Sequence, residues 1–278
     1  MKTLFIATLL LATPAFADEP SMFRGDARHS GLTNAAGVPT LHGVKWKFKT
    51  GGWVVSSPTN ANGTLYFGST DHFVYAVDAA TGTQRWKTRT GGRVMSSAAV
   101  ADGHVFIESY DGSLYSLDAK TGEVLWKFKT AGEHRFTAKH LHGGEPANEL
   151  MADPFDVYLS SPTVAHGTVY FGSGDGNIYA VDANSGEMKW KFQTGDVVHA
   201  SPALADDTVY VGSWDSFFYA LDAATGKEKW RYKTGEDFLR FYQPLLEQLR
   251  RFVGVGQIRQ QILLNRVHQI EPDQVHIF

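Results

Sequence analysis

Apolar and polar residues alternate in short runs along most of the chain, which predicts β-strands rather than helices. Residues 54–59, 64–68, 73–77 and 84–88 are four such runs, separated by turns that contain Asp and Gly. The arrangement returns at intervals of about 40 residues, which is the period of a propeller blade. The pattern therefore predicts an all-β fold, a β-propeller of four-stranded antiparallel blades.

Tryptophan marks the repeat. Five Trp residues recur at intervals of 40, 40, 64 and 40 residues, at Trp46, Trp86, Trp126, Trp190 and Trp230. Before each of the last four, an Asp can accept hydrogen bonds from the next backbone N–H groups, and a Gly can supply the positive φ of a tight turn. The Trp ring is expected to cover the Ala and Gly of a neighbouring turn and to fill the wedge between blades. The residues with this structural role are Asp78, Gly82, Trp86, Asp118, Gly122, Trp126, Asp182, Gly186, Trp190, Asp222, Gly226 and Trp230.

The recurring pattern Ala-x-Asp-x-x-Thr-Gly-x-x-x-Trp resembles the tryptophan-docking motif of pyrroloquinoline-quinone-type propellers, over residues 46–234. The N-terminal residues Met22–Asp26 and His29–Gly31 also resemble the start of non-enzymatic, periplasmic members of that family, such as the propeller of outer-membrane assembly. The resemblance implies seven or eight blades. The four repeats recognisable here are therefore expected to form an incomplete propeller.

The chain divides into segments of distinct composition. Residues 1–17 have the charged start, apolar centre and Ala-x-Ala end of a secretory signal peptide, with cleavage near Ala17. An N-terminal segment, 18–45, precedes the propeller repeats at 46–235, which carry an insertion at 131–156. The signal predicts a periplasmic or secreted product, and no run of apolar residues is long enough to predict a membrane span.

The last segment, 236–278, departs from the repeats. Residues 238–278 contain no Ala, Ser, Thr, Lys or Trp, and two runs within them have helical spacing. We expect a short helical tail of foreign composition, which either caps the last blade or results from a truncated or frameshifted gene. The second interpretation is favoured because the strand around Trp46 has no visible partner in the sequence, although propellers usually pair their terminal strands in one blade.

Charge and cysteine content narrow the functional classes. The formal net charge is −3 with both signs mixed, which predicts neither a nucleic-acid partner nor a membrane-surface partner. The chain has no cysteine, which excludes a disulfide framework and a thiolate metal site. In the insertion, His134, His140 and His142 are candidate metal ligands because imidazole suits Zn²⁺ or Cu²⁺. A solvated loop is the favoured interpretation, and no metal or other cofactor is predicted.

We therefore expect a noncatalytic scaffold that binds protein partners through a propeller face. The residues expected on that face are Trp53, Arg93, Tyr110, Trp214 and Phe217, of types that anchor protein interfaces. Open blade edges also predict self-association. The alternative is a fragment of a quinone-dependent dehydrogenase, for which the resemblance implies pyrroloquinoline quinone over Ca²⁺ and a disulfide cover. No catalytic residue is assigned.

Overall fold

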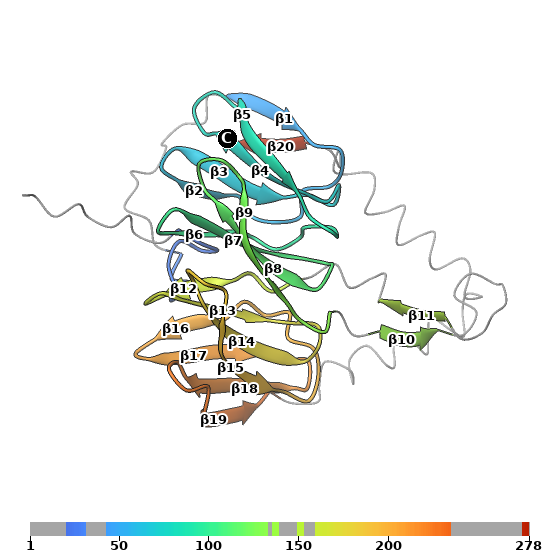
Figure 1. Ribbon diagram of the computed structural model, residues 1–278, viewed down its shortest axis with the longest axis vertical. Coiled ribbons are helices and arrows are strands. Elements are labelled where there is room, and N and C mark those ends of the chain that lie inside the picture. Colours follow the sequence, from blue (N-terminus) through green and yellow to red (C-terminus); the bar gives the residue numbers. More distant parts are fainter. Residues whose placement is uncertain are drawn as a thin grey trace, which may run out of the picture.

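The protein is described by a computed structural model in which residues 21–31, 43–132, 135–138, 149–152, 159–234 and 274–277 are placed. Most of these residues form four antiparallel sheets of four strands each, which follow one another in chain order (Figure 1). We number these sheets as blades 1 to 4. The predicted fold class, an all-β, incomplete β-propeller, is confirmed.

The strands of each blade lie side by side in sequence order. Blade 1 comprises β2 (Thr59–Ala61), β3 (Thr64–Gly68), β4 (Phe73–Asp78) and β5 (Gln84–Arg89). Blade 2 comprises β6 (Ala99–Ala101), β7 (His104–Ser109), β8 (Ser113–Asp118) and β9 (Val124–Lys129). Blade 3 comprises β12 (Thr163–Ala165), β13 (Thr168–Gly172), β14 (Asn177–Asp182) and β15 (Met188–Gln193). Blade 4 comprises β16 (Ala203–Ala205), β17 (Thr208–Gly212), β18 (Phe217–Asp222) and β19 (Glu228–Lys233).

Burial follows the position of a strand in its blade. The second strands β3 and β13 are buried along their whole length, because each blade is covered on both faces by its neighbours. The outer strand β9 alternates more exposed and less exposed residues along its second half, as a strand covered on one face does. Between blades, the apolar residues form continuous clusters, such as the one that joins Val74 of blade 1 to Ile107 and Leu117 of blade 2.

Strands β1, β5, β9 and β15 each dock an indole on the blade that follows, whereas Trp230 of the last outer strand, β19, is exposed. The Trp86 Nε1–H donates to the Ala119 carbonyl at 3.0 Å, and an added Cβ on Gly122 would lie 2.7 Å from the Trp86 ring. The same arrangement recurs for Trp46 on blade 1, Trp126 on blade 3 and Trp190 on blade 4. A side chain larger than a hydrogen has no room under the ring, and burial of a ring of this size contributes on the order of several kcal/mol per junction.

The turn that receives the indole is built by its Asp and its Gly. Asp78 Oδ1 accepts hydrogen bonds from the backbone N–H groups of Ala80 and Thr81, at 3.0 and 2.9 Å. Gly82 has a φ of 72°, and the equivalent glycines of the other three blades also have positive φ. In every blade a β-bulge precedes this turn, for example between Ala76 and Val77 in blade 1. The bulge and the turn together place the Ala carbonyl and the Gly against the preceding blade.

Serines link the inner ends of the blades. Ser57 N–H donates to Ser97 Oγ at 2.9 Å, Ser97 N–H to Ser161 Oγ at 3.0 Å, and Ser161 N–H to Ser201 Oγ at 3.0 Å. Each bond joins one blade to the next. The junctions are therefore held at their outer end by an indole and at their inner end by a serine.

Two strand predictions are corrected. The inner strand of blade 1 is β2, Thr59–Ala61, rather than residues 54–59, because Pro58 has no N–H for a sheet and the Ser57 N–H is bonded to blade 2. The strand around Trp46 has a partner: β1 (Trp46–Lys49) pairs antiparallel with β20 (Gln274–Ile277) from the far end of the chain. Such a pairing of distant segments has no periodic signal in the sequence.

The insertion and the tail are described only in part. Within the insertion, β10 (Arg135–Ala138) pairs antiparallel with β11 (Glu149–Ala152), apart from the four blades (Figure 1). In the tail, the described residues are those of strand β20, and the two runs with helical spacing lie outside the described residues. Residues 1–17, with the predicted signal peptide, lie outside them too.

The docked indole predicts different responses at two glycines of blade 2. Gly103 and Gly122 both have positive φ, but an added Cβ meets nothing within 4 Å at Gly103 and meets the Trp86 ring at Gly122. We expect Gly103→Ala to lower the free energy of unfolding by about 1 kcal/mol through backbone strain. Gly122→Ala should cost about 1 to 3 kcal/mol more because the indole is displaced. Urea unfolding followed by tryptophan fluorescence measures the free energy of unfolding of both variants. An equal decrease in the two variants would contradict docking of the indole as the main interaction between blades.

Candidate functional site

One face of the propeller carries the loops that enter each blade and the turns between its second and third strands; we call it the loop face. Most of the residues expected to bind partners lie there. Trp53 and Trp214 are 51% and 56% exposed, and the Arg93 side chain is also exposed. The backbone fixes their positions: Thr70 N–H donates to the Trp53 carbonyl at 2.9 Å, and Tyr110 N–H donates to the Arg93 carbonyl at 2.8 Å.

Phe217, which was expected on this face together with the loop residues, does not lie in a loop. Phe217 is the first residue of β18, where its ring packs against Tyr219 and lies beneath the Arg231 guanidinium, 5.0 Å from the ring centroid. The strand register gives it this position. Phe217 thus contributes to blade 4, and the exposed aromatic residue at that end of the loop face is Trp214, whose ring contacts His199 edge-on.

Carboxylates hold the loops of this face together. Asp71 Oδ2 accepts hydrogen bonds from the Gly51 N–H at 2.8 Å and from the Tyr75 hydroxyl at 2.6 Å. Blade 4 repeats the arrangement, since Asp215 Oδ2 accepts from Gly195 N–H and from the Tyr219 hydroxyl. Burial, followed by the bond to Asp215, raises the pKa of Tyr219 to about 12. The Tyr219 hydroxyl therefore keeps its proton and its hydrogen bond to Asp215 at neutral pH, which preorganises this part of the loop face.

The N-terminal segment, residues 21–31, contacts the inner ends of all four blades. Ser21 Oγ donates to the Asn60 carbonyl of blade 1, and the backbone of Ser21 pairs with Val100 of blade 2. His29 Nε2 lies 3.1 Å from Thr163 Oγ1 of blade 3. The Leu204 N–H of blade 4 donates to the Ala27 carbonyl at 2.7 Å. The segment therefore ties the four blades together in addition to the junctions between them.

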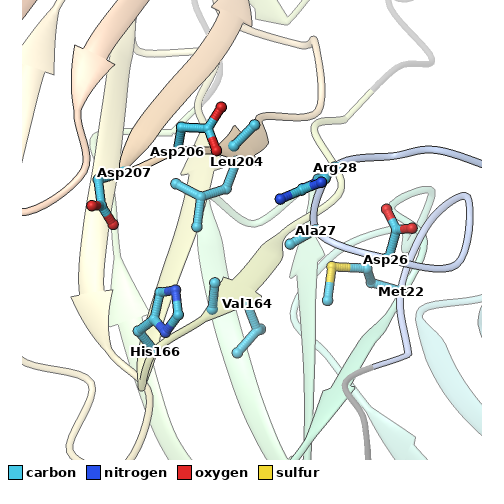
Figure 2. Close-up of a pocket in the computed structure, with 11 residues that line it drawn as sticks. Met22, Asp26, Ala27, Arg28, Val164, His166, Leu204, Asp206 and Asp207 are labelled. Carbon is cyan, nitrogen blue, oxygen red and sulfur yellow. The ribbon is translucent and has the colours of Figure 1, made fainter.

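A pocket of about 730 Å³ lies beside this segment (Figure 2). The segment supplies Asp26 and Arg28, and the turns after β12 and β16 supply His166, Asp206 and Asp207. Apolar walls come from Met22, Ala27, Val164 and Leu204. The described residues of its lining carry charges of both signs, so the pocket suits a polar contact.

His29 joins the N-terminal segment to blade 3 in its neutral form. Thr163 Oγ1 donates its own proton to the Pro202 carbonyl, so His29 Nε2 is the donor in the bond between them. Burial of the ring is the main cause that lowers the pKa of His29, followed by the charge of Arg24, while Asp26 acts in the opposite direction. Protonation of this histidine is therefore disfavoured in the folded protein.

The candidate metal ligands of the insertion, His134, His140 and His142, lie outside the described residues. Among the residues that the structure places, no three His, Asp or Glu side chains are grouped so that they could hold a metal ion. In the same part of the chain, no helix is long and apolar enough to cross a membrane.

Sequence reasoning missed two sets of residues. The serines that join the blades had a signal, because Ser-Ser-Pro occurs at 56–58 and again at 160–162, with Ala-Ser-Pro at 200–202. The residues that line the pocket had none, since Asp26 and Arg28 meet Asp206 only through the path of the N-terminal segment.

The sequence model of the family described as outer membrane protein assembly factor BamB matches residues 39–155 and 153–258. No curated protein sequence matches the chain. Among solved structures, the chain is similar to BamB from Moraxella catarrhalis, with 19% identity and a TM-score of 0.53 over 64% of this chain and 52% of that chain.

The chain is also similar to two dehydrogenases. The quinohemoprotein alcohol dehydrogenase from Comamonas testosteroni has 22% identity and a TM-score of 0.54, over 69% of this chain and 37% of that chain. A europium-containing methanol dehydrogenase has 20% identity and a TM-score of 0.53, over 68% and 43%. At these identities the likeness shows the fold, and the chain spans about half or less of the length of these proteins.

The half-buried position of His29 predicts a pH-dependent stability. An unfolded histidine takes up its proton near pH 6.5, while the folded chain resists it, so stability should be present above about pH 6.5 and fall as the pH drops below it. We expect His29→Gln, which keeps an N–H donor for Thr163, to reduce the loss of stability between pH 7 and pH 5. Urea midpoints of both proteins at the two pH values measure this. An unchanged difference between pH 7 and pH 5 would show that His29 is not a cause.

Proposed function

The chain belongs to the family of the outer membrane protein assembly factor BamB, and from this membership we propose that it is a noncatalytic propeller scaffold that binds a protein partner. The observation that carries the proposal is the exposure of two tryptophans on the loop face. Trp53 and Trp214 stand more than half exposed there on loops that backbone hydrogen bonds hold in place. Exposed Trp on a rigid surface loses little conformational freedom when a partner covers it.

Export to the periplasm or beyond is part of the proposal. It is supported by the signal-peptide pattern of residues 1–17 and by the family, whose description names outer-membrane assembly. The expected partner is thus a protein of the cell envelope. Arg93 and Tyr110 fit such a partner because both types make polar contacts at the rim of an aromatic contact area.

A quinone-dependent dehydrogenase is the second candidate, favoured by the likeness to the alcohol and methanol dehydrogenases. The residues present do not fit its cofactor. The resemblance implies a Ca²⁺ ion and a disulfide cover, but the chain has no cysteine, and the residues that the structure describes include no group of three carboxylates or histidines that could hold a metal. We therefore derive no catalytic step for this chain.

The scaffold proposal predicts which surface residues a partner needs. We expect Trp53→Ala and Trp214→Ala each to weaken capture of a partner from envelope extract about tenfold or more, as loss of an interface anchor does. Leu125→Ala and Met188→Ala are the matched controls, because these residues are similarly exposed but lie on the outer strands β9 and β15. Quantitative pull-down with the full chain measures the effect. Equal capture by all four variants would exclude the loop face as the binding surface.

The two candidate functions respond differently to added cofactor. Full-length protein mixed with pyrroloquinoline quinone and Ca²⁺ should show neither cofactor absorbance after desalting nor reduction of a dye with alcohols or sugars. The expectation rests on the donor set of the described residues. Dye reduction above the rate in buffer would replace the scaffold proposal with the dehydrogenase.

A further inference from the structure

Blade 4 is the last blade that the structure describes, and the side chains on its junction face are exposed. Trp86 and Trp190, which dock on a following blade, are 8% exposed, whereas Trp230 at the same position of β19 is 47% exposed. Two residues further along, Phe128 and Phe192 pack edge-on against aromatic rings of the next blade, while Tyr232 is 67% exposed. This face, formed by Trp230, Tyr232, Tyr210 and Ser201, is called the donating face below.

The donating face already has the shape of an internal junction. Tyr210 and Trp230 have ring centroids 6.0 Å apart and tilted by 51°, against 5.8 Å and 45° for Tyr66 and Trp86 in blade 1. Tyr66 and Trp86 both donate to the Ala119 carbonyl of blade 2. The two rings of blade 4 are therefore already arranged as in an internal junction. A partner that docks on them would not have to reorder them.

The opposite end of the arc carries the matching receiving face. There, blade 1 offers the Ala79 carbonyl, Gly82 and the stacked rings of Phe67 and Tyr75. Its outer half is covered by the short pair β1–β20, through Trp46. At its inner end, the Ser57 residue is exposed, although Ser97 and Ser161, its equivalents in blades 2 and 3, are buried and accept an N–H from the preceding blade.

We propose that the donating face of one copy of this chain binds the receiving face of a second copy, head to tail. Trp230 and Tyr232 take the places of Trp46 and Phe48 on the partner's blade 1, and β1 is displaced. Ser201 N–H then donates to the Ser57 hydroxyl. Two such junctions, one at each end, close a symmetric dimer of eight blades, because a head-to-tail contact gives a ring when its rotation closes. The inference rests on the fold and is independent of the loop-face proposal.

Hydrogen bonding favours this occupant over a face-to-face pairing. Two donating faces against each other would bury the indole N–H of Trp230 and the Ser201 N–H without an acceptor of the kind that each internal junction supplies. The receiving face supplies both acceptors, and it is built by the same sequence.

Sedimentation velocity of the full chain over a concentration series tests the proposal. We expect a discrete dimer at micromolar concentration, and Trp230→Ala with Tyr232→Ala should raise its dissociation constant at least about tenfold. Met188→Ala is the matched control, because Met188 is similarly exposed, at 51%, and lies on the outer strand β15 of blade 3. Trp46→Ala vacates the receiving turn and should strengthen the dimer. A monomer at all concentrations would overturn the proposal.

Engineered cysteines test the orientation without disturbing the rings. The chain has no cysteine of its own, and Ser57 and Ser201 lie in the first and last blades, so they meet only across copies. Under mild oxidation, Ser57→Cys with Ser201→Cys should give a covalent dimer on a non-reducing gel, whereas either single variant should stay uncoupled. A disulfide dimer of the Ser201→Cys variant alone would show a face-to-face pairing and overturn the head-to-tail arrangement, as would no coupling in the double variant.

Discussion

The docking of one indole on the next blade is the interaction on which the rest of this structure depends. It needs three things at once: a Trp on the outer strand, a carbonyl such as that of Ala119, and a glycine such as Gly122 beneath the ring. A glycine is required because its positive φ forms the turn and its missing side chain makes room for the indole. The spacing of these residues in the sequence thus sets the distance and angle between blades.

This constraint also explains where binding surfaces lie. The loops that enter the blades help to hold the junctions through Ser57 and Ser97, and carboxylates such as Asp71 tie the loops to the strands beneath. Side chains like Trp53 can then remain exposed without a cost to the fold. The N-terminal segment contacts the inner ends of the blades, for example through the bridge between Ser21 and Val100.

Structural features that recur in every repeat could be predicted from the sequence, whereas contacts that occur only once could not. The blades, the turns and the docking glycines follow from a pattern present in four copies, so each position was supported several times. The pairing of β1 with β20 and the path of residues 21–31 depend on contacts between distant segments, which leave no period. The pocket beside Asp206 was missed for the same reason. The position of Phe217 was predicted wrongly because it lies at the boundary between the turn and β18, and the pattern does not locate that boundary to within a few residues.

In a propeller, each blade is stabilised mainly by its contacts with the two blades beside it. An arc of blades therefore keeps all of its internal junctions. Among the described residues, blade 1 is covered by Trp46 of β1, whereas blade 4 exposes Trp230, the residue that docks on a following blade elsewhere in the structure. The indole that stabilises the internal junctions therefore forms a binding surface on the last blade. Because its N–H requires an acceptor, this surface favours the receiving face of another copy over an apolar surface without acceptors.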